Sequence, residues 1–246
     1  MVKVYFRLRR GWKRLNKVAQ QQVKEYLLSQ RRAKGYLNAG GQVDAYYTQF
    51  GKVLEAVMSP IKVLWLPKKP LVVKESMGRD TIYGQFFDFL SGDSKLIHKT
   101  AAILQRSEAF LSCKRPEVGR PSPTLQSLEA SPTIDLQRLT STAVCCVLAM
   151  QHQLGEAVDT SLVSWLKERQ DETGGFRASE VAPVPDLLST AVALFTLWLI
   201  GEHPQSGSRF IEAHWLDMGS FAPTLLDDYS DVEYLFYGLL ALGSDE

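Results

Sequence analysis

Two long stretches of the chain contain no charged residue. They span residues 139–155 and 187–201, and each is bounded by charged residues on both sides. Both are shorter than the roughly 20 strongly apolar residues that a transmembrane helix needs, and both contain polar side chains. We therefore expect two helices that are buried on most sides, and no transmembrane segment.

A third segment, residues 158–169, has the pattern of a helix at a protein surface. Leu162, Trp165 and Leu166 recur at helical spacing and would share one face, while the charged residues occupy the others. The segment predicts an amphipathic outer helix that covers one of the apolar inner helices.

These elements belong to an internal repeat. The unit is a helix, a turn in which glycine precedes an aromatic residue, an aspartate, and a second helix. Three copies span residues 26–54, 165–195 and 210–240. Their aspartates are Asp44, Asp186 and Asp231. Aspartate can accept hydrogen bonds from the free N–H groups of a helix start, so each should cap the helix that follows it.

Two weaker copies lie between the first and second clear ones. They are marked by Asp80 and Asp135, and residues 114–133 between them are rich in proline, which predicts an extended loop. Residues 61–67 resemble a strand between two prolines. The interpretation is a single domain, 1–246, with about five repeat units.

The alternation of amphipathic and apolar helices predicts the fold class. Five such hairpins close most naturally into a ring, with the apolar helices inside. We therefore expect an all-α protein, an α/α toroid or partial toroid of about five helical hairpins. An open solenoid is the alternative, but it would expose the inner row of helices.

The net charge of +1 conceals an uneven distribution. Residues 1–120 hold 23 Lys and Arg against 9 Asp and Glu, whereas residues 121–246 hold 5 against 18. The two halves attract each other if they meet, and the basic half can also attract an anionic partner, so we expect a protein partner at the basic N-terminal half. Nucleic-acid binding is not expected, since the acidic half would repel phosphate.

Cysteine usage and the N-terminus suggest a cytoplasmic protein. The three cysteines form no disulfide framework, and no local motif has the spacing of zinc ligands. The N-terminal residues lack the apolar region and cleavage site of a secretory signal.

The segment from Trp165 through Gly174-Gly175-Phe176 to Asp186 resembles the repeat of protein prenyltransferase β subunits and of squalene and terpene cyclases. The resemblance is good over residues 158–243 and fair over 20–58. Both families are α/α toroids, so the resemblance implies the architecture more specifically than it implies a reaction.

The resemblance to prenyltransferases implies a zinc site that this chain does not preserve. The family uses an aspartate, a cysteine two residues later and a histidine in a later repeat, and these positions fall on Asp186, Leu188 and Asp231. Leucine cannot bind a metal, so zinc is not expected. The two carboxylates would suit a hard cation such as Mg²⁺ better than zinc.

The other candidate residues come from the same resemblance. The acidic motif of the cyclases is absent, and the nearest acidic cluster adds Asp228 to Asp186 and Asp231 as candidate catalytic residues. The basic residues that bind diphosphate in prenyltransferases are reduced to Arg177. Aromatic residues on the inner helices could line a cavity or simply fill the core; the candidate ligand-binding residues are Arg177, Tyr47, Trp198 and Tyr234.

Three functions follow as hypotheses. The first is a prenyltransferase-like protein that binds an isoprenoid chain or its diphosphate, with catalysis in doubt because Leu188 and Asp231 occupy ligand positions. The second is a non-catalytic scaffold that binds another protein. The third is a terpene cyclase with an atypical acid.

Overall fold

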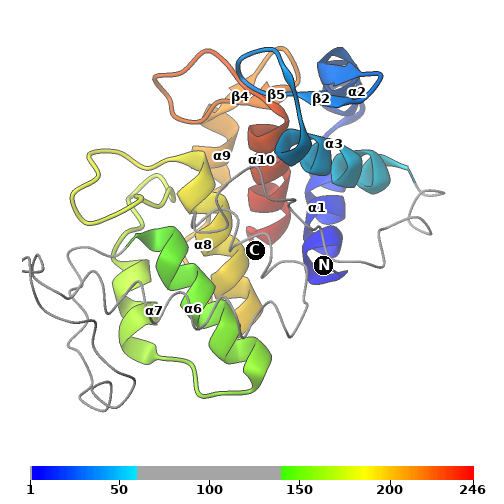
Figure 1. The fold of residues 1–246 in the computed structure, drawn as a ribbon. Coiled ribbons are helices and arrows are strands. Elements are labelled where there is room, and N and C mark those ends of the chain that lie inside the picture. Colours follow the sequence, from blue (N-terminus) through cyan, green and yellow to red (C-terminus); the bar gives the residue numbers. More distant parts are fainter. Residues whose placement is uncertain (1, 60–139) are drawn as a thin grey trace, which may run out of the picture.

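The computed structural model describes residues 2–59 and 140–246 (Figure 1). Its helices are α1 (Val2–Arg14), α2 (Lys17–Gln30), α3 (Ala45–Met58), α6 (Ser141–Leu154), α7 (Thr160–Lys167), α8 (Leu187–Ile200), α9 (Ser208–Ala213) and α10 (Val232–Ser244). Its strands are β1 (Arg31–Arg32), β2 (Gly35–Leu37), β3 (Val43–Asp44), β4 (Trp215–Leu216) and β5 (Ser220–Phe221). The described part is mostly helical, which confirms the expected all-α class.

Several predictions from the sequence concern residues outside the described part. They are the two weak repeats at Asp80 and Asp135, the strand at residues 61–67 and the proline-rich loop at 114–133.

The three clear repeats begin their inner helices as predicted. Asp44 accepts a hydrogen bond from the backbone N–H of Tyr46 at 2.7 Å, Asp186 from Ser189 at 2.8 Å, and Asp231 from Glu233 at 2.9 Å. Each aspartate is thus the N-cap of the helix that follows it, α3, α8 and α10 respectively. The spacing in the sequence located the helix starts correctly because the cap position is a local property.

The uncharged stretch 139–155 forms a helix as predicted, and a threonine caps it. The apolar helix α6 is capped by Thr140, whose hydroxyl accepts a hydrogen bond from the N–H of Ala143 at 3.2 Å. The helix therefore begins at Ser141, beyond the position that Asp135 marked. The prediction of an amphipathic helix in residues 158–169 is confirmed in part. The helix α7 starts after the cap Asp159 and buries its apolar face.

The glycine–aromatic turns are short β-hairpins, which the sequence did not predict. In the first copy Tyr36 pairs with Asp44, and in the third Trp215 pairs with Phe221. Gly174 and Gly219 have φ values of +89° and +91°, which side-chain-bearing residues rarely adopt, so glycine is needed to turn the chain there.

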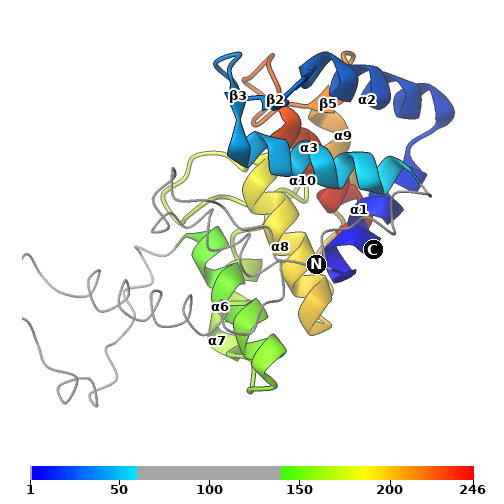
Figure 2. The same cartoon turned by 45° about the vertical axis from the view of Figure 1, so that its right-hand side comes forward.

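Inner helices of successive copies lie side by side. In both views α8 runs beside α10, α6 lies on the other side of α8, and α3 crosses α10 (Figures 1 and 2). The rings of Phe50 in α3 and Phe236 in α10 are 5.1 Å apart, so the last copy contacts the first. Twelve of the 14 residues of α8 are buried, as its uncharged sequence predicted.

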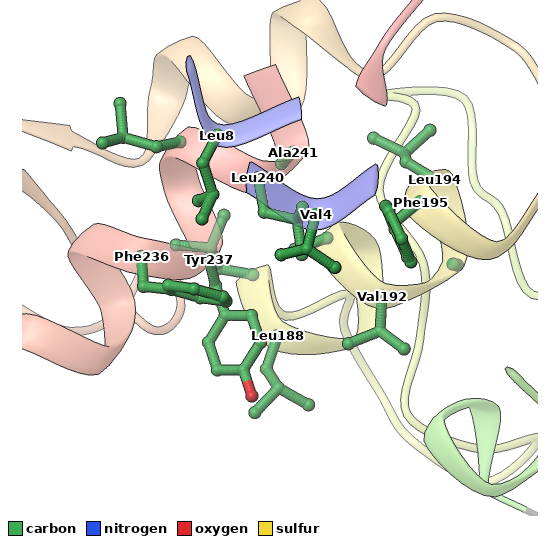
Figure 3. Close-up of a cluster of buried hydrophobic side chains, with 14 of the residues drawn as sticks. Val4, Leu8, Leu188, Val192, Leu194, Phe195, Phe236, Tyr237, Leu240 and Ala241 are labelled. Carbon is green, nitrogen blue, oxygen red and sulfur yellow. The ribbon is translucent and has the colours of Figure 1, made fainter. Parts of the chain in front are cut away.

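The N-terminal helix α1 completes this core and was not predicted from the sequence. Val4 and Leu8 pack with Leu240 and Ala241 of α10 in the buried cluster of Figure 3. The two helices approach closely because Gly11 faces the backbone of α10, and Gly243 faces the backbone of α1. A β-carbon at either glycine would overlap the carbonyl group opposite.

The basic start of the chain meets its acidic end. Arg7 donates hydrogen bonds to the carboxylate of Glu246 at 2.7 Å and to the carbonyl oxygen of Gly243 at 3.0 Å. Arg10 pairs with the same carboxylate, and Arg14 donates to the carbonyl oxygen of Leu242 at 2.7 Å. Some of the basic residues near the N-terminus therefore pair with groups inside the fold, where they complement the C-terminal end of α10.

Every helix in residues 2–59 and 140–246 is too short or too polar to cross a lipid bilayer.

Candidate functional site

Acidic and tyrosine side chains meet where the inner helices α3, α8 and α10 begin. The members of this acid–tyrosine cluster are Asp186, Asp231, Glu233, Tyr46, Tyr47 and Tyr234. They come from three repeats, and each belongs to the cap or first turn of its helix. The repeat thus places chemically useful groups at one end of the inner row.

The pair Tyr46 and Glu233 is central to the cluster. The Tyr46 hydroxyl donates a hydrogen bond to Oε1 of Glu233 at 2.7 Å, across the contact between α3 and α10. Burial raises the pKa of Glu233 to about 7, although the bond from Tyr46 opposes the rise. Burial also raises the pKa of Tyr46, so its hydroxyl stays protonated. Near neutral pH, Glu233 can therefore gain or lose a proton.

The remaining members surround this pair. Asp231 is 3% exposed and accepts backbone hydrogen bonds from Glu233 and Tyr234, and burial raises its pKa. Burial and the nearby carboxylates of Asp231 and Glu233 raise the pKa of Tyr47. Chemically, the cluster offers neutral hydroxyl donors and carboxyl groups that resist ionisation.

Two of the three candidate catalytic residues belong to the cluster. Asp186 is half-buried at the start of α8, where burial raises its pKa, and its charge acts on Tyr234. Asp228 is exposed in the loop before α10, and the structure gives it no bond to the cluster. Sequence proximity to Asp231 therefore did not bring Asp228 into the site.

The candidate ligand-binding residues are divided between distant places. Tyr47 and Tyr234 lie in the cluster. Arg177 lies in the turn before α8, where its carbonyl oxygen accepts a hydrogen bond from Ser141 at 2.5 Å. Trp198 lies about 18 Å along α8 from Asp186, at a rise of about 1.5 Å per residue, and Arg7 stacks 3.5 Å from its ring centre. Trp198 thus belongs to the contact between α1 and α8.

The zinc positions of the resembled family hold one apolar and two carboxylate side chains. Leu188 is a buried hydrocarbon side chain of the core. The Oδ1 atom of Asp231 accepts backbone hydrogen bonds that cap the start of α10. Asp186 does the same for α8. In the part of the chain that the structure describes, no three His, Cys, Asp or Glu side chains are arranged to hold a metal ion.

Sequence reasoning missed the pair at the centre of the cluster. Glu233 follows the cap Asp231 by two residues, a position that usually faces solvent at the start of a helix. Its burial results from Tyr46, which lies 187 residues away in the sequence. The signal that could have found it is the position of both residues two places after a repeat aspartate: Tyr46 follows Asp44 as Glu233 follows Asp231.

Several aromatic side chains that could have lined a cavity are packed together instead. Phe50, Phe236 and Tyr237 are each at most 1% exposed, and their rings contact one another edge to face. Val4 and Leu8 of α1 fill the adjoining space (Figure 3). These inner-helix aromatics therefore serve the core.

Comparisons of this chain with models of protein families, with curated proteins and with solved structures find no match. The functional argument therefore depends on the geometry of the chain itself.

Proposed function

We propose that this chain is a non-catalytic helical-repeat scaffold that binds another protein, and that its inner helices form part of an α/α toroid. The toroid is supported by the order of the inner helices, since α6, α8 and α10 are neighbours and α10 also contacts α3, the inner helix of the first copy.

One observation carries the scaffold proposal. The positions that would supply a metal site and a ligand cavity in the resembled enzymes serve structure here. Leu188 and Tyr237 belong to the buried core, and Asp186 and Asp231 cap helices. A repeat protein that lacks this metal site and ligand cavity still has large surfaces suited to binding.

A second candidate is the binding of an isoprenoid chain without catalysis, and the acid–tyrosine cluster favours it. Protonated tyrosines and a carboxyl group with a pKa of about 7 can donate hydrogen bonds to a polar, uncharged end group. The acids of the cluster would repel a diphosphate, so the corresponding alcohol fits better. The terpene-cyclase hypothesis gains nothing, because a carboxyl group of pKa about 7 is a weak acid for protonating an alkene.

Thermal shift separates these candidates. Farnesyl and geranylgeranyl diphosphates and the matching alcohols are added to the full chain, with and without Mg²⁺ or Zn²⁺, because a ligand that binds the native state raises its apparent stability. The scaffold proposal expects no shift. A shift that grows with chain length and is lost in Tyr47→Phe or Tyr234→Phe would favour isoprenoid binding and overturn it.

Isolation of the tagged chain from its own cells gives the positive test. The scaffold proposal expects a partner protein that remains in stoichiometric amount through size-exclusion chromatography and binds again when both proteins are purified. A chain that elutes alone under all gentle conditions contradicts the proposal.

A further inference from the structure

Two neighbouring loops expose an unusual number of large apolar side chains. The described part of the chain has ten exposed large hydrophobic residues, and five of them lie in residues 178–185 and 222–230. They are Val181, Val184, Leu225, Leu226 and Tyr229. Leu226 is 89% exposed and Val181 81% exposed, so neither side chain contributes to the core. We call these five residues the apolar loop face.

The apolar positions correspond between the two repeats. Val181 follows Phe176 by five residues, and Leu226 follows Phe221 by five; Val184 and Tyr229 each precede the cap aspartate by two. The same position on neighbouring packed helices recurs at a spacing of about 8–10 Å. The loops also adjoin, because the N–H of Leu187 donates a hydrogen bond to the carbonyl oxygen of Pro223 at 2.9 Å.

Acids outnumber cations around the loop face, where Arg169 pairs with Glu180 at 3.9 Å and the backbone of Arg177 pairs with that of Pro185. Residues 178–185 and 222–230 contain no Lys or Arg, and they contain Glu180, Asp227 and Asp228. Asp228 is exposed, and the side chain of Glu180 is 50% exposed. Over residues 178–246 as a whole, Arg209 is the single Lys or Arg, and there are 11 Asp and Glu residues. An anionic lipid surface, a nucleic acid or an acidic protein would be repelled here.

We propose that the apolar loop face docks a cationic, amphipathic segment of a partner protein. Scattered exposed hydrophobic residues are ordinary, but a group in two bonded loops, at matching repeat positions, is typical of an interaction site. The two rows of apolar side chains bind the apolar face of the segment, and the exposed carboxylate of Asp228 attracts its Lys and Arg residues. This inference rests on the proposed scaffold function and adds the surface and the partner's chemistry.

The test uses two labelled helical peptides of the same apolar pattern, one with leucine and lysine and one with leucine and glutamate. Fluorescence anisotropy measures their binding to the full chain. We expect the lysine peptide to bind, and its affinity to fall as the salt concentration is raised, because salt screens the acidic side chains. The glutamate peptide should not bind. The double variant Val181→Gln/Leu226→Gln weakens binding by roughly tenfold or more. Asp228→Asn weakens it less and reduces the dependence on salt.

Control variants distinguish binding at the apolar loop face from nonspecific hydrophobic binding. Leu28 is 64% exposed on α2, so Leu28→Gln removes another exposed leucine elsewhere and leaves binding unchanged. Circular dichroism checks that each variant folds. Equal binding of both peptides, or equal loss in Leu28→Gln, overturns the inference. So does dimerisation of the chain that the double variant abolishes, because the occupant would then be a second copy.

Failure of this inference can be told apart from failure of the scaffold proposal. If the partner isolated with the wild-type chain still binds the double variant with unchanged affinity, the scaffold stands and the loop face is not its docking site. If no partner binds but the lysine peptide does, the surface stands and the scaffold proposal is wrong.

Discussion

Some carboxylate side chains in this protein both stabilise the fold through hydrogen bonds and change the pKa of their neighbours. Asp231 caps α10 with its carboxylate and also acts on the tyrosines that surround it. Glu233 is held in a buried position by the hydroxyl of Tyr46, so its ionisation is coupled to the fold. The strength of this coupling can be measured through the effect of pH on stability.

Glu233→Gln should change how stability depends on pH. Burial raises the pKa of Glu233 from its ordinary 4.5 to about 7, so between these values the folded state keeps a proton that the unfolded chain has released. Stability therefore falls as pH rises through this window, by on the order of 2–3 kcal/mol for this group. Glutamine cannot ionise, and the variant should lose that part of the decline.

Urea denaturation of both proteins at a series of pH values measures the difference. Burial also raises the pKa of Asp186 and Asp231, so a decline of the same sign remains in the variant. Parallel stability curves for wild type and variant would contradict the coupling.

In two of the three clear repeats, one threonine links the turn to the helix. Thr190 accepts a hydrogen bond from the N–H of Phe176 at 2.8 Å and donates one to the carbonyl oxygen of Asp186 at 2.7 Å. Thr48 does the same for Tyr36 and Asp44, at 2.9 and 2.6 Å. The third copy has Leu235 at this position, so its hairpin relies on other contacts.

Thr190→Val should therefore be costly for an almost isosteric change. The variant leaves the buried N–H of Phe176 without an acceptor, which costs about 1–3 kcal/mol. Thermal or urea denaturation measures this loss. Thr160→Val, at an exposed position of α7, should stay within about 0.5 kcal/mol of wild type. If the two variants are equally stable, the threonine link has no energetic role.

The contact between α1 and α10 depends on glycine in the same way on both sides. A β-carbon at Gly243 would overlap the carbonyl group of Arg7, which belongs to a rigid helix backbone. Gly243→Ala should destabilise the protein by about 1–3 kcal/mol, even though alanine favours helix by about 1 kcal/mol. Ser164→Ala on the exposed face of α7 provides the control for denaturation. A more stable Gly243→Ala variant would show that the helices can separate without loss.

At the scale of the whole molecule, the ends of the described chain are joined by charge and packing. Arg7 is 8% exposed, stacks on Trp198, and bonds to Gly243 and Glu246. One side chain thereby connects α1, α8 and α10. Far from these ends, the exposed Asp228 beside the apolar loop face is the reason why that face favours a basic partner.

Arg7→Ala should lower the free energy of unfolding by about 2–4 kcal/mol, because the variant leaves buried polar groups unpaired and a space beside Trp198. Arg7→Met restores the volume without the charge and should recover part of the loss. Lys13→Ala, exposed on the same helix, should have little effect. Urea denaturation followed by circular dichroism measures these differences. An unchanged stability in Arg7→Ala would contradict the role of this contact.

The sequence by itself determined the local features of this protein. The repeat aspartates located the starts of α3, α8 and α10, and the uncharged run of α8 predicted its burial, because capping and hydrophobic periodicity depend on neighbours along the chain. The helical class followed from these elements. The candidate site residues Asp186, Asp231, Tyr47 and Tyr234 came from the family resemblance, and each lies at a cap or in a first turn.

Only the tertiary structure decided which of these groups meet. Tyr46 and Glu233 form their pair across α3 and α10, and Arg7 reaches Trp198 from a helix that the sequence pattern did not predict. The packing of Trp198 against α1 could not be read from spacing along the chain. Burial and contacts between distant segments depend on how helices pack, and a one-dimensional pattern records the apolar face of a helix but not its neighbour.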